Sequence, residues 1–190
     1  KVNPQSNAET FAAVKFFIDN WRWHNVPFYM LTGKRMQQAS STISIQFRDV
    51  PHFVFPSEAT DNWQQNRLVI SIQPEMSICL QMQAKRPGLD MVLNKIDMEF
   101  NYDEAAVKKT PEAYETLLLE IITGDQTLFM RADQVEAAWE LVMPILNSWQ
   151  SMTSESFPNY AADSTGPETA DALIARDGFH WFSLPLNHKK

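Results

Sequence analysis

The residues best suited to chemistry are Thr32-Gly33-Lys34-Arg35, which directly follow an aromatic stretch with an extended pattern. One interpretation is a plain strand-ending turn, in which Gly33 supplies backbone freedom and Lys34 is a solvated surface residue. The other interpretation places the Lys34 ammonium at the open end of a sheet, where it would bind an anionic group. The spacing of these residues is compatible with both, so anion binding by Lys34 is a hypothesis at this point.

The remaining reactive side chains show no catalytic or metal-binding pattern. None of the four histidines has a second histidine or a cysteine at ligand spacing, so we expect no metal site. Asp97 and Glu99 share one face of an alternating segment, which is more typical of a solvated surface than of an acid–base pair. Cys79 is interpreted as a small packing or interface residue. The sequence has only five glycines and neither Gly-x-Gly-x-x-Gly nor Gly-x-x-x-x-Gly-Lys, so no phosphate-binding loop of these kinds is expected.

Lys34 follows one of several segments that have the pattern of β-strands. Apolar and polar residues alternate through 43–47, 68–73, 77–83 and 96–102, and extended patterns also occupy 11–18 and 26–31. The short link 74–76 predicts a hairpin between two of these strands. Alternation predicts antiparallel strands with one dry face and one polar face. The polar face would meet water or a second subunit through an uncharged set, namely Ser71, Gln73, Ser77, Cys79, Gln81 and Gln83.

The pattern becomes helical after Pro111, which begins a helix that Gly124 ends at a C-cap position. A capping-box pattern at 133–136 begins a second helix, and Pro144 should bend it or end its first segment. A short third helix is predicted over 169–176. Strands followed by helices predict an α+β fold, with a large, mostly antiparallel sheet and helices packed on one face.

Length and composition are those of an ordinary globular domain. The chain has 190 residues, 44% hydrophobic and 21% charged, so we expect residues 1–190 to form one domain with its own core. The net charge of −7 disfavours a nucleic-acid partner, because phosphate binding normally requires a basic surplus. No stretch approaches the roughly 20 apolar residues of a membrane helix, so no membrane partner is expected. Cys79 is the only cysteine, which excludes an internal disulfide and suits a cytoplasmic protein.

Several blocks resemble glucose-6-phosphate dehydrogenases, and they occur in the family's order over essentially the whole chain. The longest comprises Thr10-Phe11-Ala12-Ala13-Val14-Lys15, Ile18-Asp19-Asn20-Trp21-Arg22-Trp23, Val26-Pro27-Phe28-Tyr29 and Thr32-Gly33-Lys34-Arg35. The others are Gln73-Pro74, Lys85-Arg86-Pro87-Gly88, Ala113-Tyr114-Glu115-Thr116-Leu117-Leu118, Gly124-Asp125-Gln126-Thr127-Leu128-Phe129, residues 133–139 and Gly166-Pro167-Glu168-Thr169-Ala170-Asp171. The resemblance identifies the chain as a carboxy-terminal portion of this family.

The resemblance implies substrate-binding roles for two residues. In the family, the lysine of the Gly-Lys pair reaches the substrate, and here that residue is Lys34. The glutamine of the strand-ending Gln-Pro contributes to the sugar pocket, and here it is Gln73. An ammonium suits a phosphate or sugar oxygen, and an amide can both donate to and accept from hydroxyl groups.

Two departures from the family pattern affect anion binding. Ala39 stands where many relatives carry a second basic residue, and only the hydroxyl groups of Ser40 and Ser41 follow it. Some animal relatives also have a structural nucleotide site built from Arg, Tyr and Lys. The corresponding positions here carry no charge, so no tightly bound second coenzyme is expected at Ser71, Cys79 and Gln81.

The resemblance implies a parent enzyme that oxidises D-glucose 6-phosphate to 6-phosphoglucono-lactone with NADP, in the first step of the pentose phosphate pathway. The family's dinucleotide-binding fingerprint, its Asp-His-Tyr-Leu-Gly-Lys motif and its general-base histidine all precede the matched region. Hydride transfer needs both a bound nicotinamide and a base. We therefore predict that this chain contains no catalytic or cofactor-binding residue, that NADP is bound mainly by an absent N-terminal domain, and that the chain alone is inactive.

The alternative is a non-catalytic self-association module. In the family the sheet lies at the subunit interface, so the resemblance implies a homodimer formed through the sheet. The two interpretations are compatible, because one concerns the parent enzyme and the other concerns this part of it.

Overall fold

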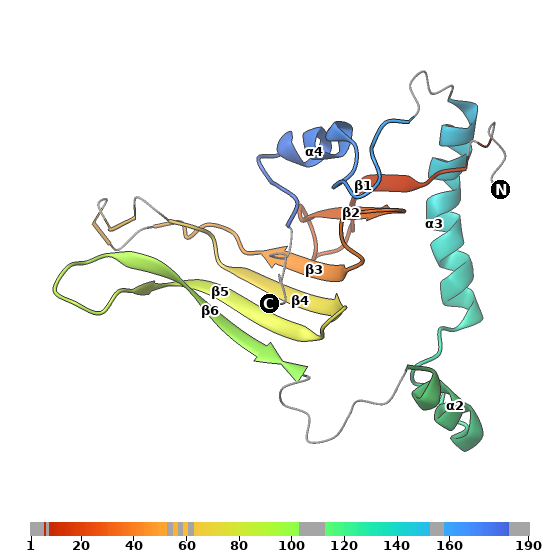
Figure 1. The fold of residues 1–190 in the computed structure, drawn as a ribbon, viewed down its shortest axis with the longest axis horizontal. Coiled ribbons are helices and arrows are strands. Elements are labelled where there is room, and N and C mark those ends of the chain that lie inside the picture. The colour runs from red at the N-terminus through yellow and green to blue at the C-terminus, as the bar shows by residue number, and fades with distance from the viewer. Residues whose placement is uncertain are drawn as a thin grey trace. The chain divides into compact units, whose positions relative to one another are not determined.

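The computed structural model describes residues 6, 8–52, 55–56, 59–60, 63–102, 113–152 and 158–182. The chain divides into two compact units, one formed by Lys1–Gln38 with Glu112–Lys190 and the other by Ala39–Pro111. The first holds a two-stranded sheet and the helices, and the second holds a four-stranded sheet (Figure 1). The predicted α+β class is confirmed, although the described strands form two sheets where one was expected. The assignment of residues 1–190 to one domain stays a prediction.

The first unit is built on an antiparallel hairpin of β1 (Phe11–Phe17) and β2 (Pro27–Gly33). The Phe16 and Phe28 rings stack across it, with centroids 5.4 Å apart. Helix α4 (Glu168–Ala175) packs against β1 and buries Ala170 and Ile174, which lie one turn apart on one face (Figure 1). The predicted helix over 169–176 is therefore confirmed, and it contributes to the core of this unit.

The second unit is an antiparallel meander of β3 (Ser41–Gln46), β4 (Arg67–Gln73), β5 (Ser77–Lys85) and β6 (Leu93–Asn101). The register aligns apolar residues across the strands in one row and mostly polar residues in the next. The apolar row is Ile43, Ile70, Ile78 and Phe100, and the adjacent row is Ser44, Val69, Cys79 and Glu99. The predicted alternation of residue types and the predicted hairpin at 74–76 are confirmed. The prediction of a dry apolar face is wrong for the described chain, because Ile43, Ile72 and Phe100 are 48%, 49% and 49% exposed.

Two further helices, α2 (Ala113–Thr123) and α3 (Ala132–Ser151), complete the described elements. Gly124 ends α2 with φ of +74°, as predicted for a C-cap. Pro144 lies inside α3, which continues to Ser151, so the predicted alternative that it ends the first helical segment is wrong, and a bend at Pro144 stays a prediction. Helices covering one face of the sheet stay a prediction. None of the described helices is long and apolar enough to cross a membrane.

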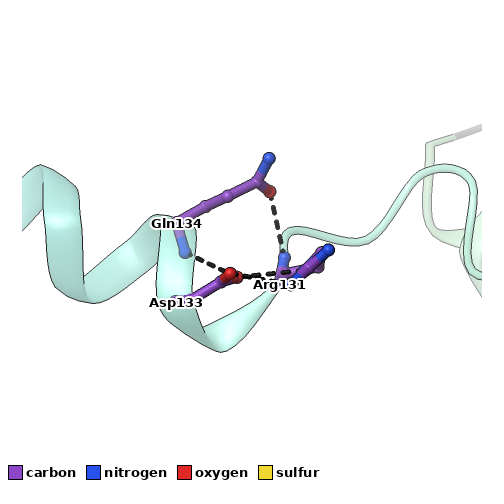
Figure 2. A network of polar contacts seen from close by, with 3 residues as sticks. All are labelled: Arg131, Asp133 and Gln134. Carbon is purple, nitrogen blue, oxygen red and sulfur yellow. Dashed lines mark hydrogen bonds and ion pairs between the residues drawn. The ribbon is translucent and has the colours of Figure 1, made fainter.

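The amino terminus of α3 differs from the predicted capping box at 133–136, because Arg131 is the N-cap residue. The Asp133 carboxylate accepts the Gln134 amide at 3.0 Å and pairs with the Arg131 guanidinium at 2.7 Å (Figure 2). The Gln134 side chain accepts the Arg131 amide at 3.2 Å. Asp133 thus binds one amide of the first turn and Gln134 binds the N-cap amide, which partly compensates for an arginine N-cap, whose side chain offers no acceptor.

Candidate functional site

Lys34 directly follows β2, and distant segments of the chain bind both polar groups of its backbone. Its amide donates to the Thr10 carbonyl oxygen at 2.8 Å. Its carbonyl oxygen accepts the Tyr160 hydroxyl at 2.9 Å, and the same hydroxyl lies 3.1 Å from the Thr10 carbonyl oxygen. These bonds fix the backbone from which the Lys34 side chain projects.

The residues after Lys34 run beside a segment from the carboxy-terminal part of the chain. The Arg35 carbonyl oxygen accepts the Asp163 amide at 2.8 Å, and the Gln37 amide donates to the Ser164 carbonyl oxygen at 2.9 Å. Arg35 and Asp163 both have left-handed backbones, with φ of 54° and 62°. The turn after β2 is therefore closed by long-range pairing rather than by its own residues.

Gly33 is required for space, not for the backbone freedom predicted from the sequence. It lies within β2, and its φ is outside the left-handed region. A Cβ at this position would lie 2.6 Å from Met36 Sδ and 2.7 Å from Phe11 Cδ2. A Cβ at Gly166 would likewise lie 2.5 Å from Phe11 Cε2. Two glycines therefore make room for the Phe11 ring, which itself packs against the Tyr160 ring at 5.5 Å.

The Lys34 side chain is exposed, and among the residues that the structure describes no ion pair or side-chain hydrogen bond engages its ammonium. Lys15 in the same unit is different, because its ammonium is paired with Asp177 at 2.7 Å. A fixed backbone with an uncommitted ammonium is what binding of an anionic group requires.

Gln73 is the last residue of β4, and its side chain is exposed. The register places Ser41 directly opposite it, and a bulge follows between Ser41 and Thr42. The Gln73–Pro74 peptide bond is cis. Ala39 and Ser40 lie just before β3 and are exposed. The structure therefore brings together Gln73 and one of the hydroxyl groups noted in the sequence, whereas Lys34 belongs to the other unit.

Arg67 is a cationic residue on the polar face that the sequence interpretation missed. It donates to Ser44 Oγ at 2.9 Å and to Gln46 Oε1 at 2.6 Å, and burial lowers the pKa of its guanidinium. It is in register with Gln81 and shares its face with Ser71. The alternation of the strand could have identified Arg67, because it lies four residues before Ser71 and residues at even spacing share a face.

The structure favours the non-catalytic interpretations of Cys79 and of the acidic pair. Burial, followed by the nearby Asp97 and Glu99 carboxylates, raises the pKa of the Cys79 thiol and so disfavours the reactive thiolate. Asp97 is exposed and lies 3.7 Å from the Lys95 ammonium. Within the described part of the chain, no three histidine, cysteine or acidic side chains gather as metal ligands.

A second polar cluster, formed by Lys15, Tyr29 and Asp177, had no signal in the sequence. The Lys15 ammonium and the Tyr29 hydroxyl both donate to Asp177 Oδ2, across 162 and 148 residues respectively. These two hydrogen bonds lower the pKa of the Asp177 carboxyl, and the bond to Asp177 raises the pKa of Lys15. Desolvation, followed by the bond to Asp177, raises the pKa of Tyr29. The cluster fastens the segment after α4 to the hairpin.

Comparisons with known proteins agree over nearly the whole chain. Residues 1–182 match the family model described as the glucose-6-phosphate dehydrogenase C-terminal domain. The chain is 49% identical to the glucose-6-phosphate 1-dehydrogenase of Mycolicibacterium smegmatis, covering 94% of this chain and 36% of that protein. It is 43% identical to the protein of the same name from Chlamydia pneumoniae, covering 96% and 36%.

A solved structure of a glucose-6-phosphate dehydrogenase in complex with its substrate glucose-6-phosphate has a TM-score of 0.81 and 33% identity, covering 96% of this chain and 37% of that one. The chain thus spans about a third of the length of the relatives that it matches.

Proposed function

The chain belongs to the glucose-6-phosphate dehydrogenase C-terminal domain family, and we propose that it forms the carboxy-terminal part of an oxidoreductase that oxidises D-glucose 6-phosphate to 6-phosphoglucono-lactone with NADP. This reaction is the first step of the pentose phosphate pathway. The observation that carries the proposal is the exposed Lys34 ammonium on a backbone fixed by Thr10 and Tyr160. It is supported by the substrate that the similar solved structure contains, which is glucose-6-phosphate.

In this proposal Lys34 and Gln73 bind substrate and take no part in proton transfer. The Lys34 ammonium donates to a phosphate or sugar oxygen, which is a charge-assisted hydrogen bond. Gln73 orients sugar hydroxyl groups, because its amide can donate and accept at once. Ser41 lies opposite Gln73 in the sheet and offers a hydroxyl to the same end of β4.

The residues of this chain do not fit NADP, so we assign them no step that involves it. The glycine fingerprint of dinucleotide binding is absent from the sequence. Positions 71, 79 and 81 carry no cation, and the Arg67 guanidinium on their face already donates to Ser44 and Gln46. NADP is bound mainly by the part of the enzyme outside this chain, and the chain alone is predicted to be inactive.

The test is reduction of NADP by the purified full-length protein, followed by absorbance, with glucose 6-phosphate as substrate. Unphosphorylated glucose is the control, since the proposed Lys34 contact requires an anionic group. We expect turnover that depends on the sugar phosphate, and none from residues 1–190 alone. Failure of the full-length protein to reduce NADP or NAD with this substrate would falsify the proposed reaction.

We also propose a homodimer formed through the polar face of the four-stranded sheet. The proposal is supported by the mainly uncharged polar side chains of that face, which can hydrogen-bond to a second copy without burying many charges.

Sedimentation of the full-length protein tests the dimer. Gln81→Glu adds a charge beside Asp97 on the polar face and should weaken association. Asn94→Glu adds the same charge on the opposite face and should leave it unchanged. A monomer at all concentrations contradicts the proposal, and so does a dimer that is equally stable in both variants.

A cytoplasmic location completes the proposal. It is supported by the single cysteine, because a chain with one thiol needs no oxidising compartment to fold.

A further inference from the structure

We propose that Tyr160 is a positioning residue for Lys34, acting on substrate binding through the lysine backbone without touching the substrate. The inference rests on the proposed substrate-binding role of Lys34. Tyr160 is half-buried and lies 126 residues from Lys34 in sequence, yet it provides the hydrogen bond to the Lys34 carbonyl oxygen.

The hydrogen bonds around Tyr160 connect both sides of the turn. Its hydroxyl lies 2.9 Å from the Lys34 carbonyl oxygen, 3.1 Å from the Thr10 carbonyl oxygen and 3.3 Å from Thr10 Oγ1. The hydroxyl has one proton, and the shortest of these distances assigns it to Lys34, while Thr10 Oγ1 can donate to the phenol oxygen. Thr10 in turn accepts the Lys34 amide at 2.8 Å. One phenol group therefore ties the residue before β1 to the residue that follows β2.

The ring of Tyr160 is held in place independently of its hydroxyl. It packs against Phe11, and the close approach of Gly33 and Gly166 to Phe11 leaves that ring little freedom. The pairing of Asp163 with Arg35 and of Ser164 with Gln37 anchors the chain that carries Tyr160. Removal of the hydroxyl alone should therefore leave the packing intact and release only the Lys34 carbonyl group.

Loss of this bond matters because the lysine side chain is long and flexible. The region that its ammonium can reach is therefore set by the position of the Lys34 backbone. Lys34 precedes Arg35, whose left-handed backbone is uncommon for a residue with a side chain and must be held by its surroundings. A neutral hydrogen bond of this kind corresponds to a change of about three- to tenfold in an equilibrium constant.

The experiment is Tyr160→Phe in the full-length protein, with steady-state kinetics. We expect KM for glucose 6-phosphate to rise about three- to tenfold, with kcat and the KM for NADP little changed. Tyr29→Phe is the matched control, because it also removes a tyrosine hydroxyl from the first unit, one that bonds to Asp177. It should lower Tm without changing KM for the sugar phosphate.

A double-mutant cycle with Lys34→Ala separates positioning from a general loss of stability. If Tyr160 acts through Lys34, Tyr160→Phe should have no further effect on KM in the Lys34→Ala background. Hydrogen exchange supplies a second readout that needs no substrate: Tyr160→Phe should speed exchange at the amides of residues 34–37 and leave 28–31 unchanged.

The outcomes distinguish this inference from the function on which it rests. An active protein in which Tyr160→Phe leaves KM and exchange unchanged, or in which Tyr160→Phe and Tyr29→Phe change KM equally, overturns the positioning role alone. A full-length protein with no sugar-phosphate oxidation overturns the proposed function and the substrate role of Lys34 with it.

Discussion

Lys34 and Gln73 have the same proposed task, but different kinds of contact hold them. Gln73 ends a strand whose position is set by its neighbours, since β3 and β5 pair with β4 and the β4–β5 link is short. Lys34 follows a separate two-stranded hairpin, and its backbone is held by Thr10 and Tyr160, which are 150 residues apart in sequence. The comparison indicates that Gln73 depends on local register, whereas Lys34 can be displaced by changes far from it.

The largest expected effect on stability is that of Gly166→Ala, in the segment that holds Lys34. Gly166 has φ of +111°, and an added Cβ would lie 2.5 Å from Phe11 Cε2 and 2.8 Å from Phe11 Cζ. Strain and overpacking together should lower the free energy of unfolding by about 2–4 kcal/mol. Urea denaturation of the full-length protein measures this loss.

Gly178→Ala is the matched control, because Gly178 also has a positive φ, of +78°, but no atom lies within 4 Å of an added Cβ. Only the backbone conformation is penalised there, so we expect a loss of about 1 kcal/mol. Equal losses in the two variants would show that the space around Phe11 is not limiting.

The next prediction concerns Lys34 itself. Lys34→Ala in the full-length protein should lower kcat/KM for glucose 6-phosphate by about ten- to a hundredfold, because a charge-assisted hydrogen bond is lost. Lys15→Ala removes a lysine from the same unit, but one already paired with Asp177, and should leave kcat/KM unchanged. Steady-state kinetics of both variants measures this difference. An equal loss of kcat/KM in both would indicate a folding defect and not the loss of a substrate contact.

Gln73→Ala should have a smaller effect, about two- to tenfold in kcat/KM, since a neutral amide makes weaker bonds than an ammonium. Gln81→Ala, on β5 of the same sheet, is the control and should leave kcat/KM unchanged. A larger loss of kcat/KM in Gln73→Ala than in Lys34→Ala would contradict the expectation that the charged hydrogen bond contributes more than the neutral one.

The same contrast between local and distant contacts explains what the sequence could predict. The strands, the hairpin at 74–76 and the C-cap at Gly124 depend on neighbours or on a simple period, and all were predicted. Arg67 could have been found by the same period. The helix start at Arg131 was missed because an arginine N-cap is unusual and its compensation by Asp133 and Gln134 is visible only in three dimensions.

The contacts around Lys34 were not predictable in this way. The sequence singled out Gly33 and Lys34 but gave the wrong reason for Gly33, because the Phe11 ring that excludes a side chain there comes from another strand. Tyr160 and Asp177 bond to partners 126 and 162 residues away, and no periodic pattern links them. Local patterns therefore predict where a site residue stands in the chain, and the fold determines what holds it.

The smallest expected effect is on Tm, and its pH dependence shows whether Asp177 stabilises the first unit through its charge or through packing. The pKa of Asp177 is below its usual value in the folded protein, so its contribution to stability is present at neutral pH and is lost as the pH falls through that lowered pKa. The pKa of Lys15 is raised above 10.5, so its contribution is present below that pH and is lost only as the pH rises through the raised pKa.

Asp177→Asn should therefore lower Tm by about 1–3 °C between roughly pH 5 and pH 9. The difference from wild type should shrink below about pH 4 and vanish only below the lowered pKa of Asp177. Calorimetry across this range measures it, with Asp90→Asn, an exposed carboxylate in the other unit, as the control. A difference that persisted unchanged in acid would mean that Asp177 acts through packing, like Gly166, because a protonated carboxyl cannot keep the ion pair with Lys15. A Tm difference that disappears in acid would instead show that Asp177 stabilises the hairpin through its charge, unlike the residues that act by close packing around Phe11.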